Sequence, residues 1–126
     1  MKKSLLILFV LLFSTTVFSQ SISKRVTDFN LEKKVAIQGY DPVAYFVQKK
    51  AVKGKSTLAS TYDGVVYHFS SQTNKDLFLK NPSSYEPQYG GWCAFAMGDY
   101  GEKVEINPET FKIIDGKLYL FYNAFF

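Results

Sequence analysis

The 126-residue sequence contains only one cysteine, one histidine and one tryptophan. A single cysteine excludes an internal disulfide and the paired cysteine motifs that hold structural zinc. A single histidine excludes a metal site built on two imidazoles. Any chemistry that requires an imidazole or a thiolate must therefore use His68 or Cys93.

The sequence also lacks a block of like charge and a long apolar run. Its formal net charge is +4, and Lys2 and Lys3 contribute two of these charges at the N-terminus. The remaining charges are nearly balanced and form no basic stripe, so we expect no nucleic-acid partner. The apolar run from Leu5 is interrupted at Ser14, before the roughly 20 residues that a transmembrane helix requires.

The N-terminal segment has the layout of a secretory signal, with a charged start, an apolar centre and small residues before the expected cleavage position. We expect cleavage after Ser19, which predicts an exported protein, periplasmic or secreted, without a stable membrane span. An uncleaved membrane anchor is the alternative. The chain then divides into a signal peptide (1–19), an N-terminal lead-in (20–36) and a domain (37–126). The oligomeric state is not indicated by the sequence.

Two Asp-Gly pairs predict β-hairpins, because this dipeptide adopts the positive φ angles of a two-residue turn. The hairpins are expected within residues 57–69 and around residues 111–122, with turns at Asp63-Gly64 and Asp115-Gly116. In the first hairpin, alternation places His68 on the face opposite the more aromatic side chains.

Three short helices are expected before and between the hairpins. Asp41 is a predicted cap for a helix that begins at Pro42, and Ser71 or Thr73 for a helix that ends near Lys80. The apolar segment before Gly98 is a third candidate, followed by a strand over residues 103–106. The pattern predicts an α+β fold, with two or three short helices packed on a small antiparallel sheet made of the two hairpins.

The first candidate site is a metal centre formed by His68, Cys93 and Met97. Helical spacing would place Met97 one turn after Cys93, on the same face. Imidazole, thiolate and thioether together suit copper(I), and zinc is the alternative if the thioether is not a ligand. Each residue also has an ordinary structural interpretation: a strand histidine bonded to a neighbour, a buried cysteine and a packed methionine.

Two other kinds of function use the same region. A thiol enzyme would employ Cys93 near a helix N-terminus, His68 as base, and Asp63 or Asp99 to orient that base. A binding module without metal or catalysis would use the tyrosines and the tryptophan as an aromatic pocket for a small ligand or a partner. Aromatic residues that only build the core are the simpler reading of the same composition.

Several motifs occur in a recognisable order along the chain. Residues 39–46 read Gly-Tyr-Asp-Pro-Val-Ala-Tyr-Phe, residues 67–71 read Tyr-His-Phe-Ser-Ser, and residues 89–94 read Tyr-Gly-Gly-Trp-Cys-Ala. Asn-Lys and Asn-Pro pairs follow the second motif, and residues 115–123 close the pattern. This arrangement resembles the exported bacterial proteins of the YHS domain family, a module named for its Tyr-His-Ser signature.

The resemblance implies heavy-metal handling, which in related domains depends on cysteines around the helix after the hairpin. Here Ser70 occupies the position of one such cysteine, so the resemblance leaves His68 and Cys93 as ligands, with Met97, Tyr40 and Asp41 in support. Exported relatives continue past the position of Phe126 with a further helix, which predicts a truncated C-terminus. We therefore expect an exported, non-enzymatic domain that binds copper or zinc, or else a structural or small-ligand module without metal.

Overall fold

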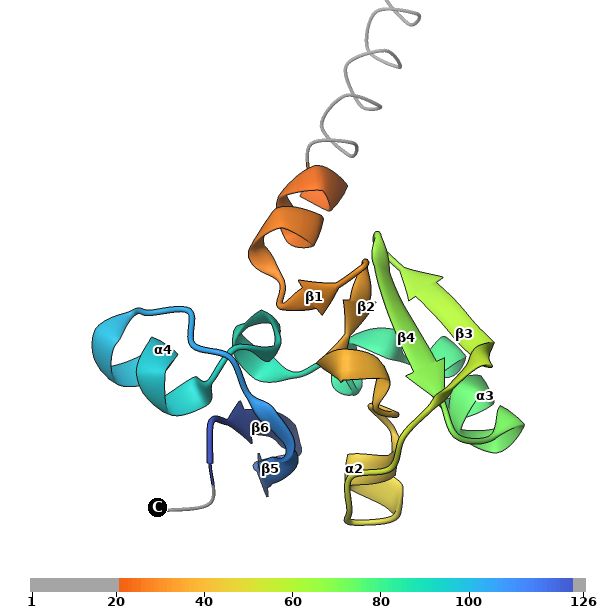
Figure 1. The fold of residues 1–126 in the computed structure, drawn as a ribbon. Helices are drawn as coiled ribbons and strands as arrows, with labels where there is room; N and C mark the ends of the chain where they lie inside the picture. The colour runs from red at the N-terminus through yellow and green to blue at the C-terminus, as the bar shows by residue number, and fades with distance from the viewer. Residues whose placement is uncertain (1–20, 124–126) are drawn as a thin grey trace, which may run out of the picture.

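The centre of the molecule is a four-stranded sheet with the strand order β1-β2-β4-β3 (Figure 1). The structure is a computed structural model that describes residues 21–123, so the expected signal peptide and Phe126 lie outside the described residues. The strands are β1 (Leu31–Glu32), β2 (Val35–Ala36), β3 (Lys55–Tyr62) and β4 (Val65–Phe69). β2 pairs with β4 in parallel and the other pairs are antiparallel, so this sheet is mixed.

The β3–β4 hairpin turns at the expected Asp-Gly pair. Asp63 and Gly64 have φ angles of 43° and 84°, as a tight turn with two positive φ angles requires. Along β4, Tyr67 and Phe69 are fully buried, whereas His68 between them is partly exposed. The predicted alternation is confirmed, and His68 projects from the face of β4 opposite its buried neighbours.

The second hairpin forms a separate two-stranded sheet from β5 (Asn107–Ile114) and β6 (Lys117–Phe121). The α+β class is confirmed. The expected single antiparallel sheet is replaced by a mixed sheet and a separate antiparallel one. The central strand β4 has β3 on one edge and β2 on the other, and the second hairpin makes its bridge elsewhere, between Leu118 of β6 and Pro87.

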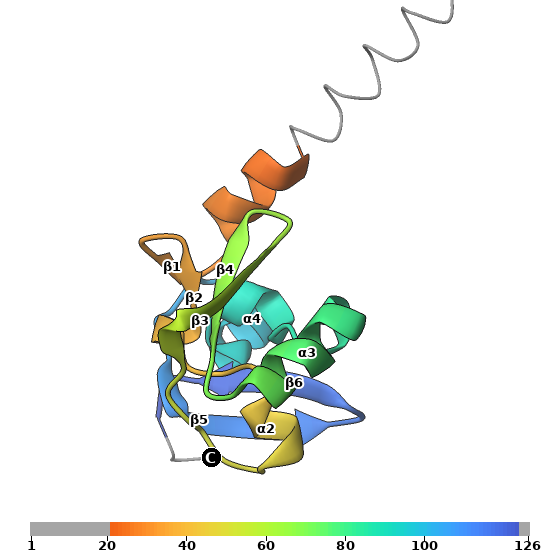
Figure 2. The same cartoon turned by 90° about the vertical axis from the view of Figure 1, so that its right-hand side faces the viewer.

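Helix α3 (Gln72–Lys80) begins directly after its predicted cap, Ser71. Helix α2 (Ala44–Val47) begins two residues later than expected, with Val43 rather than Asp41 at its N-cap position. The Asp41 carboxylate accepts the amide of Val43 at 2.8 Å, and the Ser71 hydroxyl accepts the amide of Asn74 at 3.1 Å. The Tyr45 ring on α2 packs edge-on against Phe111 of β5, with ring centroids 4.8 Å apart. Figure 2 shows the ribbon of α2 next to the second hairpin. α2 therefore connects the second hairpin to the rest of the core.

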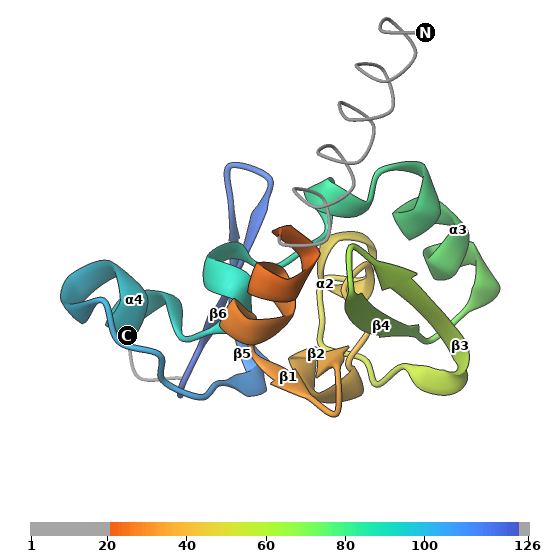
Figure 3. The same cartoon turned by 90° about the horizontal axis from the view of Figure 1, so that it is seen from above.

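Helix α4 (Ala94–Tyr100) lies at the opposite end of the molecule from α3 (Figures 1 and 3). Gly98, the expected end of this helix, lies inside it. The helix ends instead at Gly101, which adopts a left-handed conformation with φ of 68°. Residues 103–106, expected to form a strand, are irregular; the amide of Cys93 donates to the Val104 carbonyl at 2.9 Å and holds this segment beside the start of α4.

The lead-in contains a helix over residues 21–28 that the sequence reading did not identify. Phe29 and Leu31 follow it and pack against the core. No helix within residues 21–123 is long and apolar enough to cross a membrane. The core combines side chains of both sheets, and its fully buried members include Tyr45, Val65, Tyr67, Phe69, Phe78, Leu118 and Leu120.

Candidate functional site

The buried Asp41 carboxylate joins three segments of the chain. One oxygen accepts the amides of Val43 and Ala44 at the start of α2. The other accepts the Ser70 amide at 2.8 Å, the Ser70 hydroxyl at 2.7 Å and the Asn74 side-chain amide at 2.8 Å. These five hydrogen bonds occupy the acceptor capacity of the carboxylate, so Asp41 has a structural role and is not an available metal ligand.

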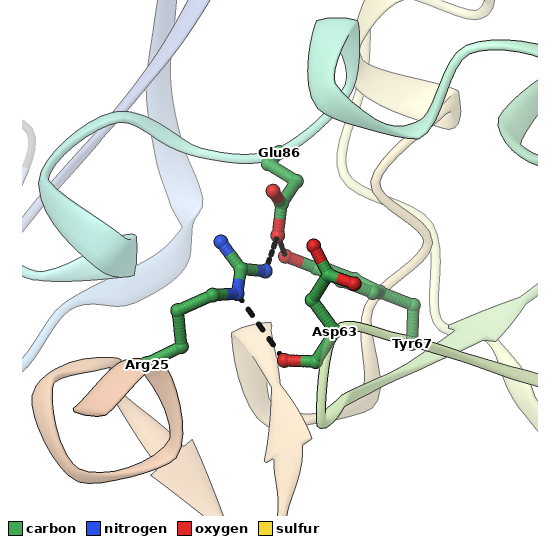
Figure 4. Close-up of polar contacts among 4 residues, drawn as sticks. All are labelled: Arg25, Asp63, Tyr67 and Glu86. Carbon is green, nitrogen blue, oxygen red and sulfur yellow. Dashed lines mark hydrogen bonds and ion pairs between the residues drawn. The ribbon is translucent and has the colours of Figure 1, made fainter. Parts of the chain in front are cut away.

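A second buried carboxylate, that of Glu86, binds Tyr67 and the N-terminal helix. The Tyr67 hydroxyl donates to Glu86 at 2.6 Å, and the Arg25 guanidinium pairs with the same oxygen at 2.8 Å (Figure 4). Arg25 Nε also donates to the Asp63 carbonyl at the tip of the first hairpin. Three segments that are distant in sequence therefore converge on one charge-assisted cluster.

The same contacts shift two pKa values. Burial, with the Glu86 charge, raises the pKa of Tyr67 well above its usual range, so its hydroxyl remains a donor. Burial alone would lower the pKa of Arg25, but the hydrogen bond and charge of Glu86 outweigh this effect and raise it. Both shifts favour the protonation states that the observed hydrogen bonds require.

His68 lies between two glycines. A Cβ added at Gly39 would lie 3.3 Å from the His68 Nδ1 atom, and one added at Gly54 would lie 2.5 Å from the His68 carbonyl carbon. Within residues 21–123 every buried side-chain nitrogen or oxygen has a hydrogen-bond partner. The imidazole of His68 makes no hydrogen bond within these residues, so its nitrogens are not among the buried atoms. The ring nitrogens of His68 are therefore accessible to solvent and available to a ligand.

Cys93 is the N-cap residue of α4 and is only 3% exposed. It belongs to the core cluster that also contains Tyr67 and Phe69, whereas His68 leaves β4 on the opposite face. Among the described residues, no group of three or more histidine, cysteine, aspartate or glutamate side chains is arranged to hold a metal ion. The convergence of His68 and Cys93 on one ion stays a prediction.

Met97 lines a different feature, a cavity of about 320 Å³. Its other walls include Phe29, Tyr89 and Trp92, and charged side chains of Asp28 and Lys103 complete the lining. Gly39 and Gly54, the two glycines beside His68, do not line this cavity. Asp99, one of the two residues proposed to orient a catalytic base, is exposed on α4, and the other, Asp63, contributes its backbone carbonyl to Arg25.

The comparison with protein families decides the identity of the central segment. The family model described as YHS domain matches residues 43–89. The protein contains a YHS domain. No curated protein and no solved structure shows significant similarity to the chain.

The side chains of the YHS signature have different roles in the structure. Tyr67 binds Glu86, and Ser70 binds Asp41, so both stabilise the YHS domain internally. His68 is the signature side chain whose hydrogen-bonding capacity is not used within the described residues. The segment before the matched region also contributes, because Arg25 completes the Glu86 cluster.

Sequence reasoning did not identify Arg25 and Glu86, or Asp28 and Lys103. Each of these charged residues looks like an ordinary surface residue in the sequence, and only the fold brings each pair together. Of these four residues, only Glu86 could have been singled out from the sequence, because it lies in the turn-rich segment between the second and third motifs.

Proposed function

We propose that this YHS domain binds a soft or borderline transition metal, with copper(I) as the first candidate and zinc as the second. His68 is the primary ligand, and Cys93 and Met97 are the further ligands that the sequence suggests. The observation that carries the proposal is the solvent-accessible imidazole of His68, which has Gly39 beside its Nδ1 atom and no hydrogen-bond partner in the described chain. The YHS family is often linked to metal handling, which supports this choice.

The donor set accounts for the preferred metals. A neutral imidazole binds both copper and zinc, whereas thiolate and thioether ligands favour copper(I). Cys93 is buried in the core cluster that contains Tyr67 and Phe69, on the side of β4 opposite to His68, so its participation would require a rearrangement of the core as well as of the start of α4. A site in which His68 is the ligand at the surface would exchange its metal readily, which suits transfer between partners better than permanent storage.

The proposal is tested by titrating reduced protein with copper(I) and, separately, with zinc, against a chromophoric chelator. We expect binding tighter than micromolar that is lost in His68→Ala. Cys93→Ser and Met97→Leu then show whether each sulfur contributes, because a true ligand costs at least tenfold in affinity when removed. Absence of micromolar binding, or unchanged binding in His68→Ala, would overturn the proposal.

The second candidate is a structural or interaction module without metal. It is favoured by the burial of Cys93 and by the five hydrogen bonds that occupy Asp41. Under this alternative, elemental analysis of protein purified from its native source finds no stoichiometric metal.

A further inference from the structure

The cavity beside Met97 has the properties of a built binding site. It lies where the end of the N-terminal helix meets η3 (Gln88–Gly91) and the start of α4. The Asn30 amide donates to the Gly90 carbonyl at 2.9 Å and holds the first two of these segments together. The volume of about 320 Å³ is at the lower end of the range for small-molecule sites, which excludes a folded partner or a long peptide inside it.

The walls are held in position by specific backbone geometry. Gly90 has φ of +60°, and a Cβ there would lie 3.2 Å from the Phe29 ring, so glycine permits the close approach of these segments. Tyr89 adopts a positive φ of 56°, which is uncommon for a residue with a large side chain. Such strain persists where the surrounding structure enforces it and is frequent at ligand sites.

Trp92 is fixed as one wall of the cavity. Its indole nitrogen donates to the Asp28 carbonyl at 2.7 Å, and the Lys103 ammonium lies 5.9 Å from the centre of its ring. Together with Met97 and the other two rings, Trp92 gives the cavity a mainly apolar lining. This lining suits a compact apolar group.

Two opposite charges complete the cavity. The Lys103 ammonium and the Asp28 carboxylate are 3.6 Å apart, and both side chains are about half exposed, at 46% and 51%. An ion pair this long and this exposed contributes little to stability, so a ligand can separate the two groups at small cost. Arg25 is a second cation near the cavity, because it lies over the Phe29 ring. It is already paired with Glu86 and does not alter the pairing of Asp28 with Lys103.

We propose that the cavity binds a free α-amino acid with an apolar, preferably aromatic, side chain. The ligand ammonium pairs with Asp28, the ligand carboxylate pairs with Lys103, and the side chain packs against Trp92 and Met97. A zwitterion replaces one loose ion pair with two, whereas a ligand of a single charge leaves either Asp28 or Lys103 without a partner. The charge pattern therefore selects an amino acid over an amine, an acid or a neutral aromatic molecule.

The test uses the full-length, metal-free protein and isothermal titration calorimetry. The probes are L-phenylalanine, phenethylamine, phenylacetate and benzyl alcohol, which carry both charges, one of either sign, or none. We expect L-phenylalanine to bind most tightly, with each missing charge costing about fivefold in affinity. Trp92 is the only tryptophan, so a saturable fluorescence change with the same midpoint locates the ligand at this cavity.

Two charge variants give opposite expected results. Lys103→Gln should weaken L-phenylalanine and phenylacetate about fivefold and leave phenethylamine unchanged or tighter, because the repelling cation is removed. Asp28→Asn should weaken L-phenylalanine and phenethylamine and spare phenylacetate. Lys50→Gln, an exposed residue outside the cavity, is the matched control and should change none of these affinities.

The proposal is overturned if L-phenylalanine produces no saturable response, if benzyl alcohol binds equally well, or if the two charge variants fail to discriminate between the probes. Its outcome is independent of the metal proposal, because the titrations contain no metal and His68 lies outside the cavity. His68→Ala should therefore bind L-phenylalanine like the unaltered protein, and a loss of binding in that variant would count against the assigned location.

Discussion

Replacing Asp41 by asparagine removes a single charge at the point where α2, β4 and α3 are joined. The new side chain would retain one oxygen toward the amides of Val43 and Ala44 and present an NH₂ group to the three donors from Ser70 and Asn74. The opposite orientation would leave two backbone N–H groups at the start of α2 without an acceptor. The first orientation is therefore favoured.

The magnitude follows from the donors that can adapt. The Ser70 hydroxyl can rotate and the Asn74 amide can flip, so each can accept a hydrogen bond from the new NH₂ group. The Ser70 backbone N–H cannot change, and a buried unpaired donor costs about 1–3 kcal/mol. Loss of the charge-assisted bonds adds to this, so we expect Asp41→Asn to lower the free energy of unfolding by about 3 kcal/mol.

Urea unfolding followed by Trp92 fluorescence measures this change, with the slope of the transition checked for constancy. Asp76→Asn is the matched control, because Asp76 is a carboxylate on α3 that accepts one solvent-exposed hydrogen bond from Gln72. Its expected effect is within about 0.5 kcal/mol. If Asp41→Asn proves as mild as the control, the carboxylate is not the junction described above.

Three further predictions concern packing, pH and reactivity. In thermal melts, Gly54→Ala should destabilise the protein by about 3 kcal/mol, because its Cβ would overlap the His68 backbone. The control is Gly98→Ala on α4, whose Cβ would meet the Tyr89 hydroxyl at an ordinary contact distance of 3.8 Å. This control should be neutral or stabilising. The raised pKa of Tyr67 means that its contribution to stability is complete below about pH 10, the unfolded value, and is lost as pH rises toward the folded value. Tyr67→Phe should reduce this alkaline loss of stability. If the variant and the unaltered protein lose stability equally between about pH 9 and pH 12, the prediction is contradicted. Cys93 should react with a thiol reagent only after unfolding, since it is 3% exposed; rapid labelling of the native protein would instead favour the thiol-enzyme alternative.

The parts of the fold that the sequence predicts depend on local chemistry. The two Asp-Gly turns appear at the expected positions because the positive φ angles are a property of those two residues. The cap at Ser71 and the Asp41 hydrogen bonds before α2 are equally local, since each side chain bonds an amide two or three residues ahead. Burial on alternate residues of β4 follows in the same way from the period of a strand.

The parts that the sequence did not predict depend on distant contacts. The helix at residues 21–28 has no clear apolar period, and its position is fixed by Arg25, 61 residues away from its partner Glu86. The parallel pairing of β2 with β4 depends on a two-residue strand, which carries almost no pattern of its own. Gly98 and Gly101 are both plausible helix ends, and only the tertiary context selects the second.

The candidate site shows the same division. The scarcity of histidine and cysteine was sufficient to select His68 and Cys93, but their relative orientation depends on the sheet. An aromatic pocket that uses the tyrosines and the tryptophan was one of the alternatives, and Tyr89 and Trp92 do line the cavity. Its charged residues were not anticipated, because Asp28 and Lys103 come from separate segments and each has an ordinary appearance in the sequence. Met97 was singled out as a metal ligand, and the structure shows it in the wall of that cavity.

The Arg25–Glu86–Tyr67 cluster has a practical consequence for producing the protein in pieces. The segment that the family model matches, residues 43–89, excludes Arg25 at one end and the buried Leu118 and Leu120 at the other. A fragment cut at those borders would leave the Glu86 charge uncompensated and one side of the core open to water. The stretch that identifies the family is thus shorter than the stretch that must be synthesised to obtain a stable protein.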